Sequence, residues 1–340
     1  MLQIVWICIH VLKIVQCVTA FQFTSGLIKP RPHPPLFVPV KGWEPPTVSA
    51  APGKTRQKLY HTRPSRSNAI PTSTLHLQAF ALPTCDVRNV YRLAGIFGMA
   101  GLVSQLGLTK LLERSERTRK NAGYTAHTMI ALVLMTLVSW VGVVGWWWTA
   151  MPLTAAERLL SQSDSCRWLA AVVFGMFAFW DIPTSLMIPA LRKPDVVVHH
   201  MIMTAMAYIA ANHLPTHYAF FHFGVSELSS IPLLIYDQLS ILTKDKDGDG
   251  SRLVKFRDAF QVVAAGSFTV VRALLFTAVT LGRFVPDAVF VLSSSAANAH
   301  VLMMLRIVLA ASVGFTALQL YWFYEMLRVM FKGEERSSIE

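Results

Sequence analysis

The sequence predicts an all-α membrane protein, a polytopic bundle of about seven transmembrane helices that follows a disordered N-terminal region. Only 15% of the 340 residues are charged and 53% are hydrophobic, whereas a soluble domain carries about 25% charged residues. Apolar runs of membrane-spanning length recur along the chain after residue 85. The basic residues of this part gather in alternate connections between those runs, as membrane topology requires.

The first twenty residues predict a signal peptide. Residues 2–12 form an apolar run that is too short to cross a bilayer. Val18 and Ala20 have the small side chains that suit cleavage before Phe21. No basic residue precedes Lys13, so an uncleaved N-terminal anchor is the alternative.

Residues 21–85 predict a disordered, basic segment rich in proline and serine. Residues 21–80 hold ten prolines, eight Lys or Arg and one acidic residue, Glu44. Such a composition cannot bury enough apolar surface to fold. A segment of this kind after a Phe21 cleavage site resembles the two-part plastid presequences of algae with secondary plastids, and a disordered lumenal linker is the alternative. The predicted location is therefore a plastid membrane or the endoplasmic reticulum.

Seven apolar runs predict the transmembrane helices. They are residues 91–112, 126–148, 168–190, 196–214, 216–242, 260–281 and 303–328. They lie in a transmembrane domain at 86–332, which a polar tail at 333–340 follows.

The connections between these runs support the count of seven. Connections on one side hold fourteen Lys or Arg, and those on the other side hold three, Arg158, Arg167 and Arg283. Because positive residues accumulate on the cytosolic face or its equivalent, we expect the C-terminus inside. The net charge of +12 follows this topology, so no nucleic acid partner is predicted.

Ionisable side chains inside the predicted spans are the candidate site, because such residues are rare in membranes and usually face the bundle interior. They are Asp181, His199, His200, His222, Glu227 and Arg272. Asp181, Glu227 and Arg272 fall near one depth at 1.5 Å per residue, so Arg272 is expected to pair with one of the two carboxylates. Adjacent histidines point about 100° apart on a helix, so one of His199 and His200 should face the interior and the other a neighbouring helix or the headgroups.

The histidine pair is the candidate catalytic group, since a buried neutral imidazole acts as a general base or nucleophile. Asp181 or Glu227 would orient the imidazole. The alternative is a structural hydrogen-bond network that joins the helices.

No metal or other cofactor is predicted. Residues 245–250 match the first half of an EF-hand loop, but Phe256 stands where the bidentate Glu belongs, so a turn-forming loop is expected. His213 and His217, around the turn after the fourth span, are expected to be surface histidines.

Five stretches, in the same order along the chain, resemble the motifs of the TLC-domain superfamily. They are Phe174–Asp181, Lys193–His200 with the histidine pair, Ser226–Pro232, Phe268–Arg272 and Leu318–Tyr324. The superfamily contains ceramide synthases, translocon-associated membrane proteins and TLC-domain lipid regulators. The resemblance covers residues 91–332 and is closer to the small TLC-domain proteins than to ceramide synthases.

This resemblance implies helices around a lipid-accessible cavity, with the histidine pair at the cavity, lipid contacts from His222, Ser226 and Arg272, and membrane lipids as partners. In ceramide synthases the pair is catalytic and a His-Asp…Asp motif follows it. Here Phe223 stands at the first aspartate of that motif, which removes a carboxylate that would orient the imidazole.

Three functions follow from the resemblance. We favour a protein that regulates membrane lipid composition through a lipid-binding cavity, because Phe223 replaces the aspartate. The alternative is a ceramide-synthase-like N-acyltransferase with acyl-CoA as substrate, in which His199 or His200 activates an amine or carries the acyl group and Arg272 holds a carboxylate. A membrane trafficking receptor is the third.

Overall fold

The computed structural model describes residues 87–149, 151–160, 163–214, 216–243, 252–294 and 297–337, and every regular element in them is a helix. The predicted signal peptide, the basic segment at 21–85 and the loop at 245–250 lie outside the described residues.

Most of the chain that the structure describes is α-helical. The α-helices are α2 (Val87–Leu112), α3 (Glu116–Arg119), α4 (Ala122–Trp148), α5 (Ala155–Leu160), α6 (Asp164–Met176), α7 (Ile182–Met187), α8 (Pro194–Asn212), α9 (Ser230–Thr243), α10 (Arg252–Ser267), α11 (Phe276–Val279), α12 (Val285–Ser293) and α13 (Ala299–Ser337). Shorter π-helical turns join several of them into longer rods. These turns are η1 (Phe177–Asp181), η3 (Phe220–Gly224), η5 (Phe268–Leu275) and η6 (Thr280–Phe284). The 3₁₀ turns are η2 (Pro189–Leu191) and η4 (Val225–Ser229).

Five helical runs among the described residues are long and apolar enough to cross a membrane. They are Arg88–Leu112, Ala122–Trp148, Asp164–Met187, Arg252–Ser293 and Ala299–Met330. The predicted fourth and fifth spans coincide with α8 and with η3, η4 and α9, which are helical but do not meet the same criterion of length and hydropathy. The chain is a multi-pass membrane protein.

The helical run that contains the predicted sixth span is longer than the predicted residues 260–281. It continues from Arg252 to Ser293 through η5, α11 and η6. Pro286 does not end it, although proline removes one backbone N–H from a helix; the residue follows the π turn η6, at the start of α12.

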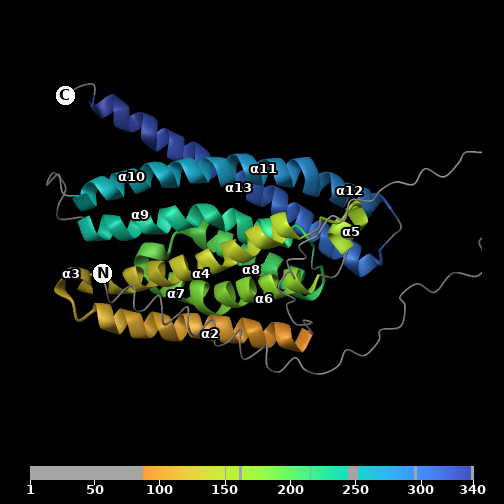
Figure 1. Cartoon of the computed structure of the whole chain (residues 1–340), viewed down its shortest axis with the longest axis horizontal. Coiled ribbons are helices and arrows are strands. Elements are labelled where there is room, and N and C mark those ends of the chain that lie inside the picture. The colour runs from red at the N-terminus through yellow and green to blue at the C-terminus, as the bar shows by residue number, and fades with distance from the viewer. Residues whose placement is uncertain are drawn as a thin grey trace, which may run out of the picture. The chain divides into compact units, whose positions relative to one another are not determined.

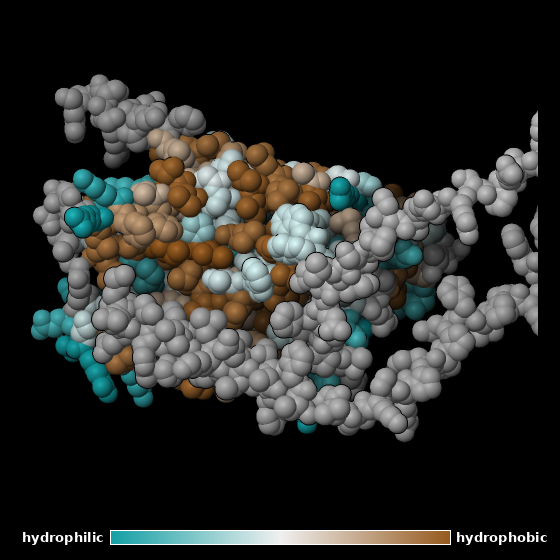
Figure 2. Space-filling view, in the orientation of Figure 1, coloured by the Kyte–Doolittle hydropathy of each residue, from teal (hydrophilic) through white to brown (hydrophobic). Residues whose placement is uncertain are grey.

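The connections alternate between two ends of the helical bundle. The short helix α3, the end of α9 and the start of α10 lie at one end, here called the α3 end, and α5 and α12 lie at the other, here called the α5 end (Figure 1). The middle of the helices presents hydrophobic surface and the hydrophilic residues gather toward the ends (Figure 2). Exposed side chains of the spans include Met99, Trp140, Val262, Val270 and Tyr321, as contact with lipid requires.

Glycines let two pairs of helices approach closely. A Cβ atom built on Gly142 of α4 would overlap the backbone of Gly224 in η3, and one built on Gly175 of α6 would overlap the backbone of Ala94 in α2. Membrane helices pack through such small residues, because lipid provides little hydrophobic force to press helices together.

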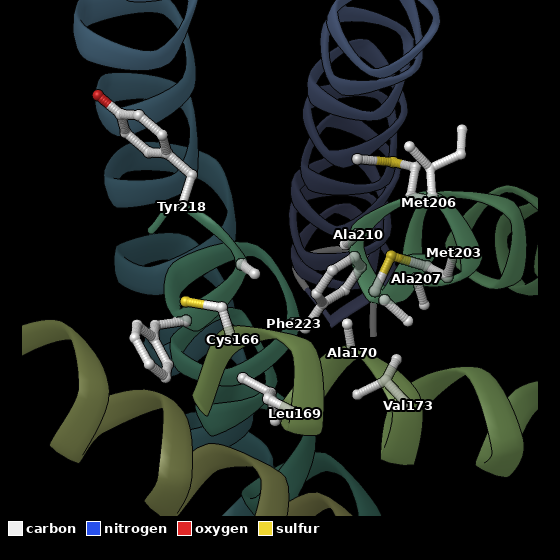
Figure 3. Close-up of a cluster of buried hydrophobic side chains, with 14 of the residues drawn as sticks. Cys166, Leu169, Ala170, Val173, Met203, Met206, Ala207, Ala210, Tyr218 and Phe223 are labelled. Atoms are coloured by element: carbon white, nitrogen blue, oxygen red, sulfur yellow. The ribbon is translucent and has the colours of Figure 1, made fainter. Parts of the chain in front are cut away.

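Helix α6 packs through a largely apolar face on α8. Figure 3 shows Ala170 and Val173 of α6 beside Met203 and Ala207 of α8, all of them in the buried apolar core. The Cys166 thiol is free and buried, and it fills space in the apolar core. This interface holds α8, and with it the histidine pair, against the third span.

Candidate functional site

Asp181 lies at the centre of a polar cluster inside the bundle. The residue ends η1 and is 3% exposed. Its Oδ1 atom lies 3.1 Å from Nε2 of His127 in α4, and its Oδ2 atom lies 2.5 Å from Nδ1 of His200 in α8. The second contact is a short approach between the carboxylate and the imidazole nitrogen. One carboxylate therefore contacts imidazoles from two other helices, and we call these three residues the Asp181 cluster.

His127 is held in place on three sides. Its Nδ1 atom lies 3.1 Å from Oγ1 of Thr184, and its ring stacks on Trp180 with the centroids 4.8 Å apart. A carboxylate accepts hydrogen bonds and cannot donate them, so Nε2 of His127 carries the proton that faces Asp181. Sequence reasoning missed this residue, although it is an ionisable side chain within the predicted second span.

The two adjacent histidines diverge, as their spacing predicts. His200 faces Asp181, and His199 faces α13, where its ring stacks on Phe315 with the centroids 4.6 Å apart and lies 5.1 Å from Trp322. His199 is 6% exposed, and its Nδ1 atom has no hydrogen-bond partner among the described residues.

Helices α8 and α13 contact each other along a line that we call the α8–α13 seam. Near the α3 end of this seam, Nε1 of Trp322 donates a hydrogen bond to Oδ2 of Asp195 at 3.0 Å. His199 with Phe315 follows along the seam. The histidine therefore lies where two membrane helices meet.

A second buried cluster joins η4 and α9 to η5. Nη2 of Arg272 lies 2.8 Å from Oε2 of Glu227, and its Nε donates to Oγ of Ser229 at 2.8 Å. Ser230 bridges the pair, because its hydroxyl lies 2.6 Å from the same Glu227 oxygen and accepts from Nη2 of Arg272 at 2.8 Å. Of the two carboxylates predicted to pair with Arg272, the structure selects Glu227.

His222 and Ser226 lie apart from the Asp181 cluster. Nε2 of His222 lies 3.2 Å from Oγ1 of Thr280, and the Ser226 hydroxyl donates to the backbone carbonyl of His222 at 2.7 Å. His222 lines a cavity of about 20 Å³ together with Met206 and Phe284. A cavity of this size holds about one water molecule, and the lipid-accessible cavity implied at the histidine pair stays a prediction.

The π-helical turns position the polar side chains of the bundle. Asp181 belongs to η1, His222 to η3, Arg272 to η5 and Thr280 to η6. A π turn inserts an extra residue into an α-helix and is frequent at functional sites. The turns η1, η5 and η6 lie inside longer helical runs, and each changes the direction in which the following side chains project, which a regular helical spacing does not predict.

A third polar group closes the α5 end of the bundle, and sequence reasoning missed it. Arg158 of α5 binds both carboxylate oxygens of Asp287 in α12, at 2.6 and 2.7 Å. Tyr218 donates its hydroxyl to the same carboxylate at 2.6 Å. The hydrogen bonds to Asp287 raise the pKa of Arg158 above its ordinary value, so the guanidinium stays charged.

The prediction that His217 is a surface histidine is wrong. Its side chain is buried and stacks on Trp146 with the centroids 5.3 Å apart, and its backbone N–H donates to the carbonyl of Arg158 at 2.9 Å. The turn after α8 folds inward against α5, which carries this histidine into the protein. His213 is half-buried and lies beside His300 instead.

We expect Arg158→Ala to lower the stability of the purified protein by about 2 kcal/mol, because the Asp287 carboxylate would lose two charged hydrogen bonds. Thermal unfolding in detergent measures the change. Arg283→Ala is the matched control, since Arg283 is exposed and its Nη1 atom contacts Sδ of Met151 at 3.7 Å. Equal losses in the two variants would contradict the assigned role of Arg158.

Comparison with protein families shows that residues 113–328 match the TLC domain, and this range contains both buried clusters and the seam. No curated protein and no solved structure matches the chain.

Proposed function

The chain belongs to the TLC-domain family, and on this premise we propose that it regulates membrane lipid composition by binding a lipid at the His199–His200 pair. The multi-pass helical bundle and the family match agree with a lipid-related role in a membrane.

The observation that carries this proposal is the Nδ1 atom of His199, which has no hydrogen-bond partner among the described residues. A buried polar atom without a partner costs about 1–3 kcal/mol, and a lipid hydroxyl, amide or ester group would supply the missing hydrogen bond. Phe315 and Trp322 offer apolar walls beside the ring. Val198 and Met201 on either side of the pair are 51% and 58% exposed, so the membrane lipid lies next to this part of α8.

An N-acyltransferase is the second candidate, and the Asp181–His200 contact favours it. A carboxylate beside an imidazole orients it and stabilises its charged form after proton transfer. This chain has Phe223 where the family motif has an aspartate. Asp181 of the third span nevertheless places a carboxylate beside His200. In this mechanism a neutral His200 accepts the proton of a long-chain amine as the amine nitrogen attacks the thioester carbon of an acyl-CoA. His200 then returns the proton to the sulfur as the carbon–sulfur bond breaks, and coenzyme A leaves as the thiol.

The contacts of Arg272 argue against one predicted role. Its guanidinium is bound to Glu227, Ser229 and Ser230, so we assign it to the helix-joining network rather than to a substrate carboxylate. The trafficking-receptor alternative gains no support from these contacts.

We expect His199→Ala to reduce the lipid retained by the purified protein about tenfold, which corresponds to about 1.4 kcal/mol. Native mass spectrometry of protein extracted in mild detergent measures the retained lipid. Met201→Ala is the control, because this side chain faces the membrane from the same helix. Equal retention by wild type and His199→Ala would exclude binding at His199.

Lipid analysis of cells separates the two candidate functions. Cells that lack the gene would be complemented with wild type, His199→Ala, His200→Ala or Asp181→Asn, at equal protein levels. The regulator predicts altered phospholipid acyl chains and unchanged N-acylated lipids. N-acylated lipids that rise with wild type and not with His200→Ala or Asp181→Asn would identify the acyltransferase. Identical lipids in complemented and deficient cells would exclude both functions.

A further inference from the structure

Two histidines meet at the α5 end of the α8–α13 seam. His213 directly follows α8, and His300 is the second residue of α13. Nε2 of His300 lies 3.4 Å from Nδ1 of His213, with the ring centroids 5.0 Å apart and the planes at 75°. His213 is half-buried and His300 is exposed, so an ion can reach both nitrogens.

We propose that His213 and His300 form a binding site for a transition metal ion of the Zn²⁺ type. Zinc binds imidazole nitrogen at about 2.0–2.1 Å, so two nitrogens on one tetrahedral ion lie about 3.3–3.4 Å apart. The observed separation matches this value, while it is long for a hydrogen bond between two nitrogens. A metal ion would therefore fit between the rings after small rotations and would replace a weak contact.

The local structure holds both rings near this position. The His213 ring packs edge-on against Tyr208, with the centroids 5.9 Å apart. Asn298 caps the start of α13, because its Oδ1 atom accepts a hydrogen bond from the backbone N–H of Val301 at 2.9 Å. This cap fixes the backbone beside His300, so the two ligands come from two ordered helix ends.

The site has two protein ligands. No third His, Cys, Asp or Glu joins the pair within the residues that the structure describes, so water molecules would complete the coordination. Imidazole suits Zn²⁺, Cu²⁺ and Ni²⁺, and the affinity should follow the order in which Cu²⁺ exceeds Ni²⁺ and Zn²⁺. Mg²⁺ prefers oxygen ligands and should not bind here.

A bound ion would tie together the adjoining ends of α8 and α13. The same two helices are joined near the α3 end by the Asp195–Trp322 hydrogen bond. His199 lies between this hydrogen bond and the proposed metal site. The ion would therefore oppose separation of the helices around His199. Only this effect on lipid access rests on the proposed function, whereas binding of the ion does not.

Thermal unfolding of the full chain, purified in detergent with a tag that contains no histidine, tests the site. After treatment with a chelator, the protein is titrated with ZnCl₂ and in parallel with MgCl₂. We expect Zn²⁺ alone to raise the unfolding temperature in a saturable manner. His300→Gln, and the double variant with His213→Gln, should raise the zinc concentration for half of this effect at least about tenfold.

The four histidines of residues 1–86, His10, His33, His61 and His76, remain in every variant and provide a constant background. Equal zinc curves for wild type and the double variant would overturn the proposal, as would equal effects of Zn²⁺ and Mg²⁺ on wild type. The second comparison needs no variant, so the test stands even if a substitution impairs folding. Loss of lipid retention in His199→Ala with the zinc effect intact would show that the two proposals are independent.

Discussion

Replacing Arg272 with methionine should unfold a large fraction of the protein, because it would leave the Glu227 carboxylate without its cation. The two side chains are 7% and 4% exposed, and their charged atoms lie 2.8 Å apart. Removal of one partner from a buried ion pair destabilises a protein by about 3–5 kcal/mol. We expect a lower unfolding temperature in detergent and less folded protein in the membrane fraction.

A second substitution separates the buried charge from the lost packing. In Arg272→Met with Glu227→Gln, no charge remains to be buried, and the glutamine can still accept the hydrogen bond from Ser230. We expect this double variant to recover most of the stability, since buried ion pairs are replaced by neutral groups at little cost. A double variant as unstable as Arg272→Met would show that the ion pair is not the cause.

Gly142→Leu should also destabilise the protein strongly, through packing alone. A side chain at this position overlaps the backbone of Gly224 and of Phe220, and backbone atoms cannot turn aside as a flexible side chain would. Overpacking costs about 1–3 kcal/mol and occasionally more, and here α4 would have to move away from η3. We expect aggregation or a strongly lowered unfolding temperature, measured by size-exclusion chromatography and thermal unfolding in detergent.

Gly314→Leu is the matched control for this prediction. Gly314 lies in α13, and a Cβ atom built on it meets no heavy atom within 4 Å. The same substitution should leave stability unchanged or slightly raised, because glycine is a poor helix former. Equal damage by both variants would mean that lost flexibility, and not the contact between α4 and η3, causes the effect.

The helical spans were largely predictable, because hydropathy and length report directly on whether a segment suits a bilayer. Predicted runs coincide with α2, α4 and α8 to within a few residues. The sixth span was predicted too short, because Arg283 and Pro286 are typical of a loop and here continue a helix. Sequence composition indicates whether a segment prefers lipid or water. It says less about the residue at which the helix ends.

The sequence predicted which residues belong to the site better than it predicted which of them contact one another. Asp181, Glu227 and Arg272 lie at similar depths in their spans. Depth alone therefore allowed Arg272 to pair with either carboxylate. The choice of Glu227 depends on which helix faces meet, and this is settled by packing of η4 against η5. Asp287 and Arg158 were missed for another reason, because a charge in a presumed loop gives no sign that it is bound to another helix.

The four π turns have a consequence for comparing this chain with its relatives. A relative that forms an ordinary α-helix in place of η1 would have one residue fewer there, and its alignment with this chain would need a one-residue gap inside a span. An alignment without that gap displaces every later position of the helix by about 100° around its axis. Asp181 would then be matched with the neighbour of its true counterpart, and a shared polar position would be read as lost.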